Sequence, residues 1–188
     1  YREDPVRMLR AIRFATKLNM QIAPSAAEPI PQLAVLLKNI PAPRLFDELV
    51  KLLLAGKAFD NFMLMRDTKV LKQLLPQLDK LLKQEPEGKA FTLATQALQN
   101  TDERVDADKP VTPAFIFAAL LWYPVELRSQ ALVIDGLSEI DAMNIAMTEV
   151  LDDIQRTIAI PKRFTLSMRD IWALQSRLTK RAGRRAVK

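Results

Sequence analysis

Two charged residues near the start of the chain are the first candidates for chemistry. Asp4 precedes Pro5, and this pair predicts a helix start, because the carboxylate accepts a free N–H of the first turn and Pro suits the first helical position. Arg7 follows about one turn later. An Asp acceptor beside an Arg donor complements the edge of an adenine, which offers an amino donor next to a ring acceptor. In the alternative interpretation, Asp4 only caps the helix and Arg7 is its ion-pair partner.

The helix that follows separates its charged and apolar side chains. Arg10 and Arg13 share one side, whereas Phe14 and Leu18 flank Arg7 within an apolar arc that we expect to face the core. A guanidinium is not buried among apolar side chains without a partner or a ligand. The position of Arg7 therefore predicts either an ion-pair partner, for which Asp4 is close enough, or a ligand.

The composition excludes several kinds of chemistry. The 188 residues include no Cys and no His, which removes thiol nucleophiles, imidazole bases, disulfide bonds and zinc sites of the usual kind. No apolar stretch is long enough to span a membrane, so we expect no membrane partner. The absence of Cys is typical of a cytoplasmic protein, which is the localisation we expect.

Apolar residues recur every three or four positions without any strand signal, which predicts an all-α fold, an irregular helical array. Pro76 should kink or split its helix, and the polar stretch 101–112 should connect two sub-domains. Asp106 and Asp108 lie in that stretch, where no strand holds them on one face, so we assign no metal ligand. We expect helical segments over residues 5–19, 31–39, 43–56, 57–67, 70–83, 88–100, 113–123, 124–135, 138–159 and from 166 onward.

Positive charge is concentrated at the C-terminal end. Residues 1–155 carry 18 Lys and Arg against 21 Asp and Glu, whereas residues 156–188 carry 10 against 1. The last cations fall within about 140° of a helix. They lie beside an apolar arc that includes Leu174 and Leu178 and should dock on the rest of the fold. Such a stripe favours contact with RNA phosphates over a solvated face. Its members are Arg177, Lys180, Arg181, Arg184, Arg185 and Lys188.

Two segments resemble signatures of a known family. The pattern Glu-Asp-x-x-Arg that ends at Arg7, followed by Leu-Arg-Ala-x-Arg-Phe ending at Phe14, is similar to the motif that opens the neck of class II nucleotidyltransferases. These are the bacterial poly(A) polymerases and the CCA-adding tRNA enzymes, and the form with Pro5 and Met8 is closest to the former. The segment 44–54 resembles the second neck signature.

The resemblance implies an enzyme that adds AMP from ATP to RNA 3′ ends. In that family, the positions that match Asp4 and Arg7 contact the base of the incoming nucleotide. Arg10 and Arg13 are then expected on nucleotide or RNA phosphate. Residues 1–60 would form the neck and residues 61–188 the body. The catalytic head, with its Mg²⁺ ligands, precedes the neck in the family and is not in this sequence, so we expect these 188 residues to have no catalytic residue and no activity alone.

Two alternatives stay open. A CCA-adding tRNA nucleotidyltransferase shares the Asp-x-x-Arg pair and would add cytidine to truncated tRNA. A non-catalytic helical adapter that binds RNA would explain the basic C-terminal stripe without any nucleotide site.

Overall fold

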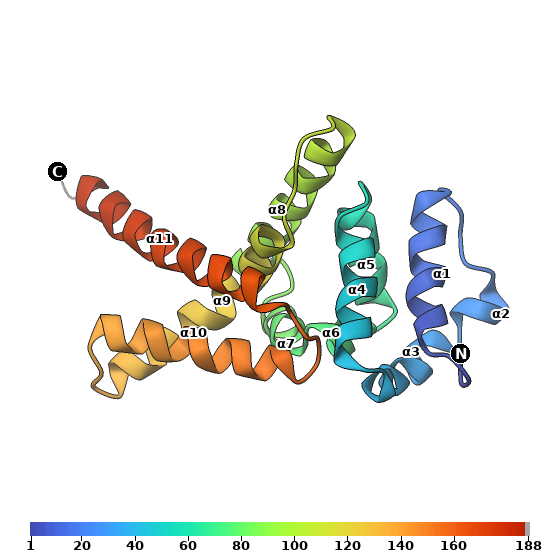
Figure 1. Ribbon diagram of the computed structural model, residues 1–188, viewed down its shortest axis with the longest axis horizontal. Helices are drawn as coiled ribbons and strands as arrows, with labels where there is room; N and C mark the ends of the chain where they lie inside the picture. The colour runs from blue at the N-terminus through green and yellow to red at the C-terminus, as the bar shows by residue number, and fades with distance from the viewer. Residues whose placement is uncertain (187–188) are drawn as a thin grey trace.

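The computed structural model describes residues 1–186, except for the side chains of Ser176 and of residues 179–186, and this part of the chain forms helices and no strand (Figure 1). The all-α prediction is confirmed. In chain order the helices are α1 (Val6–Lys17), α2 (Pro24–Ala27), α3 (Ile30–Leu33), the 3₁₀ helix η1 (Ala34–Asn39), α4 (Ala42–Leu53), α5 (Ala58–Asp67), α6 (Leu71–Leu74), α7 (Pro76–Gln84), α8 (Lys89–Asp106), α9 (Pro113–Ile134), α10 (Glu139–Gln155) and α11 (Lys162–Ala186).

The N-terminal helix group consists of α1, α4 and α5, which stand side by side and pack on one another (Figure 1). α1 turns Met8, Leu9 and Ile12 toward this packing, and all three side chains are buried. The predicted core-facing arc of α1 is thus confirmed at Met8 and Ile12, at one edge of the arc, but wrong at Phe14 and Leu18. Phe14 is 49% exposed and Leu18 is also exposed, because α4 and α5 both cover the opposite side of the helix.

The C-terminal helix group consists of α7 to α11, with α9 packed against the other four. α9 is apolar nearly all round, as expected for a helix buried by several neighbours. It starts where Thr112 Oγ1 accepts the N–H of Ala114 at 3.3 Å, with Pro113 as its first residue. Pro124 lies inside this helix, so the two segments expected over residues 113–123 and 124–135 form one helix.

α4 joins the two groups through an aromatic side chain. The ring of Phe46 lies 5.7 Å from that of Phe117 on α9 and 6.2 Å from that of Phe164 on α11, measured between centroids. One hydrophobic core runs from α1 to α11. The expected boundary at residue 60 falls within α5.

The junction of α5 and α8 corrects a second prediction. Asp102 of α8 accepts the N–H groups of Ala58 at 2.7 Å and Phe59 at 3.0 Å, which caps the start of α5. The stretch 101–112 is thus helical as far as Asp106 rather than a connector throughout, because the buried Thr101 and the bonds of Asp102 to α5 fix its first residues against the fold. Gly56 has φ +81°, and a Cβ there would lie 3.2 Å from Asp106 Oδ1.

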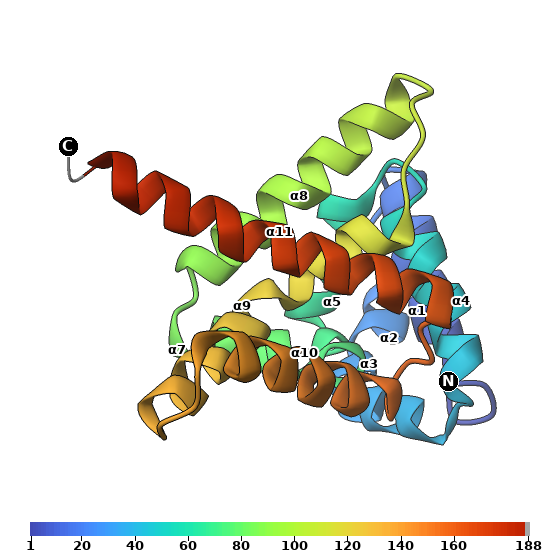
Figure 2. The same ribbon diagram turned by 60° about the vertical axis from the view of Figure 1, so that its left-hand side comes forward.

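Pro76 begins α7 directly after α6, so the predicted split of this segment is confirmed. α11 crosses α9 and starts at Lys162, four residues earlier than expected (Figure 2). It docks through Met168 and Trp172, whose indole N–H donates to the Ala118 carbonyl at 2.9 Å. The predicted docking arc of this helix was wrong at Leu174 and Leu178, which are exposed, whereas Ile171 of the same arc is partly buried against the core. Among the helices of residues 1–186, none has the length and apolar character needed to cross a membrane.

Candidate functional site

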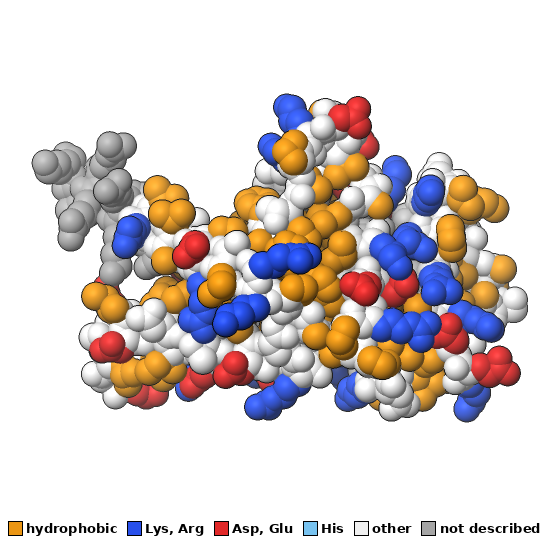
Figure 3. Space-filling model, viewed as in Figure 1, with side chains coloured by type: hydrophobic (Ala, Val, Ile, Leu, Met, Phe, Trp, Pro, Cys, Tyr) orange, Lys and Arg blue, Asp and Glu red, His pale blue; other side chains and the backbone are white. Residues whose placement is uncertain are grey.

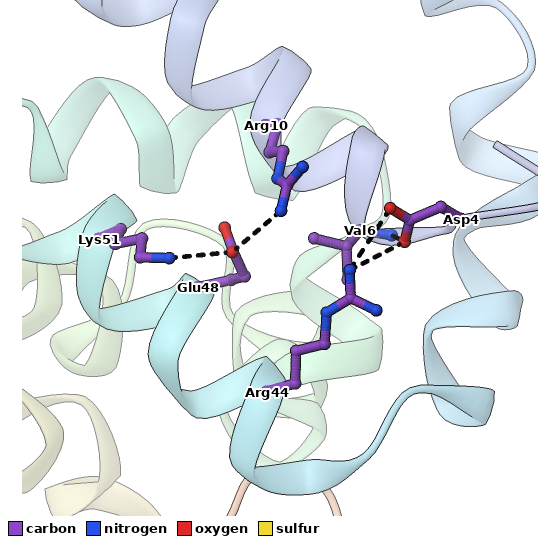
Figure 4. Close-up of polar contacts among 6 residues, drawn as sticks. All are labelled: Asp4, Val6, Arg10, Arg44, Glu48 and Lys51. Atoms are coloured by element: carbon purple, nitrogen blue, oxygen red, sulfur yellow. Dashed lines mark hydrogen bonds and ion pairs between the residues drawn. The ribbon is translucent and has the colours of Figure 1, made fainter.

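Asp4 lies just before α1 and binds two groups. Its Oδ1 accepts the N–H of Val6 at 3.3 Å, as expected for a carboxylate at a helix start. Its two oxygens also face Arg44 Nη2 of α4, at 3.3 and 3.4 Å (Figure 4). The expected neighbour, Arg7, is not the ion-pair partner of Asp4, because Arg44 reaches across from the facing helix. The Asp4 side chain keeps 25% of its surface exposed, so one edge stays open to a ligand.

Glu48 forms a second charged contact between the same helices. Its side chain is 6% exposed, and its Oε1 lies 3.1 Å from Lys51 Nζ and 3.8 Å from Arg10 Nη2 (Figure 4). A carboxylate buried this far needs such partners. Arg44 and Glu48, one turn apart on α4, therefore each contact a charged residue at the start or on the first turns of α1.

Arg7 is exposed, and within the described part of the chain its guanidinium takes part in no hydrogen bond or ion pair. It shares its side of α1 with the exposed Phe14 and Leu18. On the face shown in Figure 3, Lys and Arg side chains gather over the helices α1 and α4. The guanidinium of Arg7 is thus free to meet a ligand, beside an apolar surface on which a base could rest.

Arg10 and Arg13 lie on the adjoining side of α1. Arg10 is exposed apart from its contact with Glu48. The guanidinium carbon of Arg13 lies 5.1 Å from the centroid of the Phe14 ring, and its buried Nε has no hydrogen-bond partner. The structure therefore brings the four predicted nucleotide residues onto the start and one flank of a single helix, with Asp4 engaged and Arg7 open.

Asn61 is a residue that the sequence did not single out. It is buried on α5, donates to the Leu52 carbonyl at 2.7 Å, and its Oδ1 accepts from the hydroxyl of Thr16 at 2.6 Å. These bonds tie α5 to both α4 and α1. The sequence offered little signal for it, because Asn61 follows another polar residue, Asp60.

The predicted RNA stripe lies mostly beyond the described side chains. Arg177 is exposed on α11. The other predicted members of the stripe lie outside the residues whose side chains the structure describes: Lys180, Arg181, Arg184, Arg185 and Lys188.

Asp106 is the last residue of α8, and Asp108 follows with φ +52°. Within the described residues, no three Asp or Glu side chains gather into a possible metal site.

Two sequence profiles match the chain. Residues 19–82 match "Probable RNA and SrmB-binding site of polymerase A", and residues 135–188 match "Polymerase A arginine-rich C-terminus". Poly(A) polymerase I of Salmonella typhi is 47% identical over the whole chain. The chain belongs to the poly(A) polymerase family. Poly(A) polymerase I of Haemophilus influenzae is 45% identical over 97% of the chain.

The chain matches only part of each relative. The chain spans 41% of the length of each of these two poly(A) polymerases. A CCA-adding enzyme of Limosilactobacillus fermentum is 46% identical over 71 residues, which are 37% of this chain and 18% of that enzyme. Similarity to a poly(A) polymerase thus extends along all the helices described above, whereas similarity to this CCA-adding enzyme covers about a third of the chain.

Proposed function

We propose that the chain is the neck and body of a poly(A) polymerase, an enzyme that adds AMP from ATP to RNA 3′ ends. Residues 1–60 would be the neck and residues 61–188 the body. The catalytic head and its Mg²⁺ would belong to another part of the protein, and we assign no metal ligand to this chain. The proposal is supported by the 47% identity to Poly(A) polymerase I over the whole chain.

The observation that carries the nucleotide site is the open guanidinium of Arg7. It is exposed and unpaired among the described residues, one turn from a carboxylate that is itself partly open. Asp4 would accept the adenine amino group, and Arg7 would donate to the neighbouring ring nitrogen. The contact with Arg44 holds the Asp4 carboxylate in place beside the start of α1.

Arg10 and Arg13 are proposed for phosphate of the nucleotide or of the RNA end. Arg10 keeps an exposed guanidinium despite its contact with Glu48, and Arg13 has an Nε without a partner. Farther along the RNA, the C-terminal stripe that begins at Arg177 would contact phosphates. Such contacts bind RNA of many sequences, which suits an enzyme that extends different 3′ ends.

The base-reading role is tested by Arg7→Ala in the intact enzyme. We expect the ratio of kcat/KM for ATP over CTP to fall by about tenfold or more, because a two-point base contact discriminates by roughly 1–3 kcal/mol. Lys17→Ala is the matched control, since Lys17 is an exposed cation in the last turn of the same helix. An unchanged ratio in Arg7→Ala would reject the role of Arg7.

CCA addition is the second candidate, favoured by the match to the CCA-adding enzyme over 71 residues. The intact protein would be incubated with each nucleotide separately. Lengthening of unstructured RNA with ATP alone supports the poly(A) polymerase. Addition of cytidine to truncated tRNA would overturn it in favour of the alternative.

A further inference from the structure

A groove of about 710 Å³ lies where η1, α4, α6, α7 and the end of α10 meet. Its floor includes the apolar side chains of Ile40, Leu45 and Pro76. Its walls carry five cations from four separate parts of the chain, and no aromatic residue lines it. The five cations are Lys38, Lys72, Lys80, Lys83 and Arg156.

The positive charge of this groove is largely uncompensated. Asp79 is the one carboxylate among the lining residues, and it pairs with Lys83 at 2.7 Å. The other four cations are exposed and form no hydrogen bond or ion pair with the described residues. Four like charges around one hollow repel each other unless an anion lies between them. The groove is therefore suited to a polyanion.

The fold builds the groove from positions that are distant in sequence. The break at Pro76 separates α6, which carries Lys72, from α7, which presents Lys80 and Lys83 one turn apart. Arg156 follows the last residue of α10. The lining thus draws on both segments that match polymerase A profiles, residues 19–82 and 135–188.

The surrounding surface limits where an anion would bind. A neighbouring groove shares Lys80, Gln84 and Arg156 with this one, but it also carries three acidic residues, Glu149, Asp152 and Asp153. Excess positive charge is thus confined to the first groove. On the other side, Ala42 and Leu45 line the groove while Arg44, on the same turn of α4, reaches Asp4. The groove and the pair of Asp4 with Arg44 therefore adjoin the same turn of α4.

We propose that this basic groove holds phosphates of single-stranded RNA just behind its 3′ end. The inference rests on the proposed poly(A) polymerase function. It adds a phosphate site distinct from both the proposed nucleotide residues of α1 and the C-terminal stripe. Lysine ammonium groups bind phosphate as point charges. Because no aromatic side chain lines the groove, the bases would not be stacked there, and binding would be insensitive to sequence.

The test measures the affinity of the 188-residue chain for a short fluorescein-labelled oligo(A). Binding is monitored by fluorescence anisotropy at several salt concentrations. The variant Lys72→Gln/Lys80→Gln removes two groove cations. The matched control, Lys89→Gln/Lys109→Gln, removes two exposed cations that lie outside the groove and have no partner among the described residues. Circular dichroism would verify that both variants keep their helices.

For two lost phosphate contacts, the slope of log K against log salt should become less steep by about 1.4, and affinity at about 0.1 M salt should fall about 25-fold. The control should bind within about twofold of the wild type, and Lys72→Arg/Lys80→Arg should restore binding, since both changes keep the charge. Equal losses in the groove variant and the control would overturn the groove site while leaving the proposed function intact. A wild-type chain that binds no RNA would overturn the proposed function and the groove site together.

Discussion

The N-terminal helix group (α1, α4 and α5) and the C-terminal helix group (α7 to α11) are held together by different interactions. Between α1 and its neighbours the contacts include Asp4 with Arg44, Glu48 with Arg10, and the Thr16 hydroxyl with Asn61. Around α9 the buried contacts are mainly apolar and aromatic, with Phe117 and Trp172 fully buried, and the ion pair of Arg128 with Glu149 lies at the exposed surface. Both groups leave some apolar side chains exposed, but α9 packs on four helices of its group, whereas α1 packs on two.

This difference separates the helix that carries the proposed nucleotide-binding residues, α1, from the helix that supports its neighbours, α9. A cation that must meet a nucleotide has to stay near the surface, so the helix that carries it is fixed by ion pairs at its rim and by apolar packing only on its far side. A helix that only supports its neighbours can be apolar nearly all round. The contrast predicts that equal side-chain truncations will have unequal effects in the two groups.

The largest effect is expected from Phe117→Ala in α9. Removal of a fully buried ring that packs on Phe46 should cost about 3–5 kcal/mol of unfolding free energy, because a cavity remains. Phe14→Ala on α1 removes the same side chain from an exposed position and should change stability by less than about 0.5 kcal/mol. Urea unfolding followed by circular dichroism measures both. Equal losses would show that the two helices are packed alike.

A smaller effect is expected from Glu48→Gln on α4. Loss of the charge weakens the contacts with Lys51 and Arg10, whose side chains are nearly half exposed, so the cost should be about 1 kcal/mol. The cost should shrink as salt is raised, since exposed charges are screened. Urea unfolding at low and high salt measures this difference. A cost that is independent of salt would mean that Glu48 contributes through packing and not through charge.

The smallest effect concerns Asp102, at the junction of the two groups. Burial raises the pKa of this carboxyl above its usual value near 3.8, and the N–H groups of Phe59 and Ala58 only partly offset it. The folded protein therefore holds this proton more tightly than the unfolded chain. The resulting stability is present below the unfolded pKa and is lost as pH rises through the folded pKa.

Asp102→Asn removes that dependence. The stability of the variant relative to the wild type should therefore increase as pH rises above about 4, because only the wild type loses this contribution. Thermal unfolding of both proteins across this pH range measures the trend. A relative stability of Asp102→Asn that falls as pH rises would show that the two N–H bonds outweigh burial.

The fold class, the split at Pro76 and the start of α10 at Ser138 followed from local rules of helix geometry. Ser138 Oγ accepts the N–H of Asp141 at 3.2 Å and so caps the helix that was expected to begin there. Local rules did not identify which side of an amphipathic helix is covered. Phe14 and Leu174 were assigned to the core by type, yet each lies on a side of its helix that no neighbour in the described chain covers. Only the tertiary arrangement decides that.

The pairing of the residues in the candidate site could not be predicted from the sequence. The motif around Asp4 and Arg7 predicted a nucleotide site, which stays a prediction, and it did not indicate that the partner of Asp4 is Arg44, forty positions away. The basic groove could not be predicted from the sequence for the same reason, since Lys38 and Arg156 come together only when the chain folds. Whether Lys180 and the cations after it meet RNA stays a prediction.

The contacts on the two sides of α4 connect the two helix groups. Arg44 and Glu48 hold the first turns of α1, while Phe46, between them in sequence, is wedged against rings of α9 and α11. A helix held on both sides passes a displacement from one side to the other, so RNA bound in the proposed groove would shift Arg44 and, with it, Asp4 at the proposed nucleotide site. By reciprocity, a nucleotide at that site would change the affinity for RNA by the same factor.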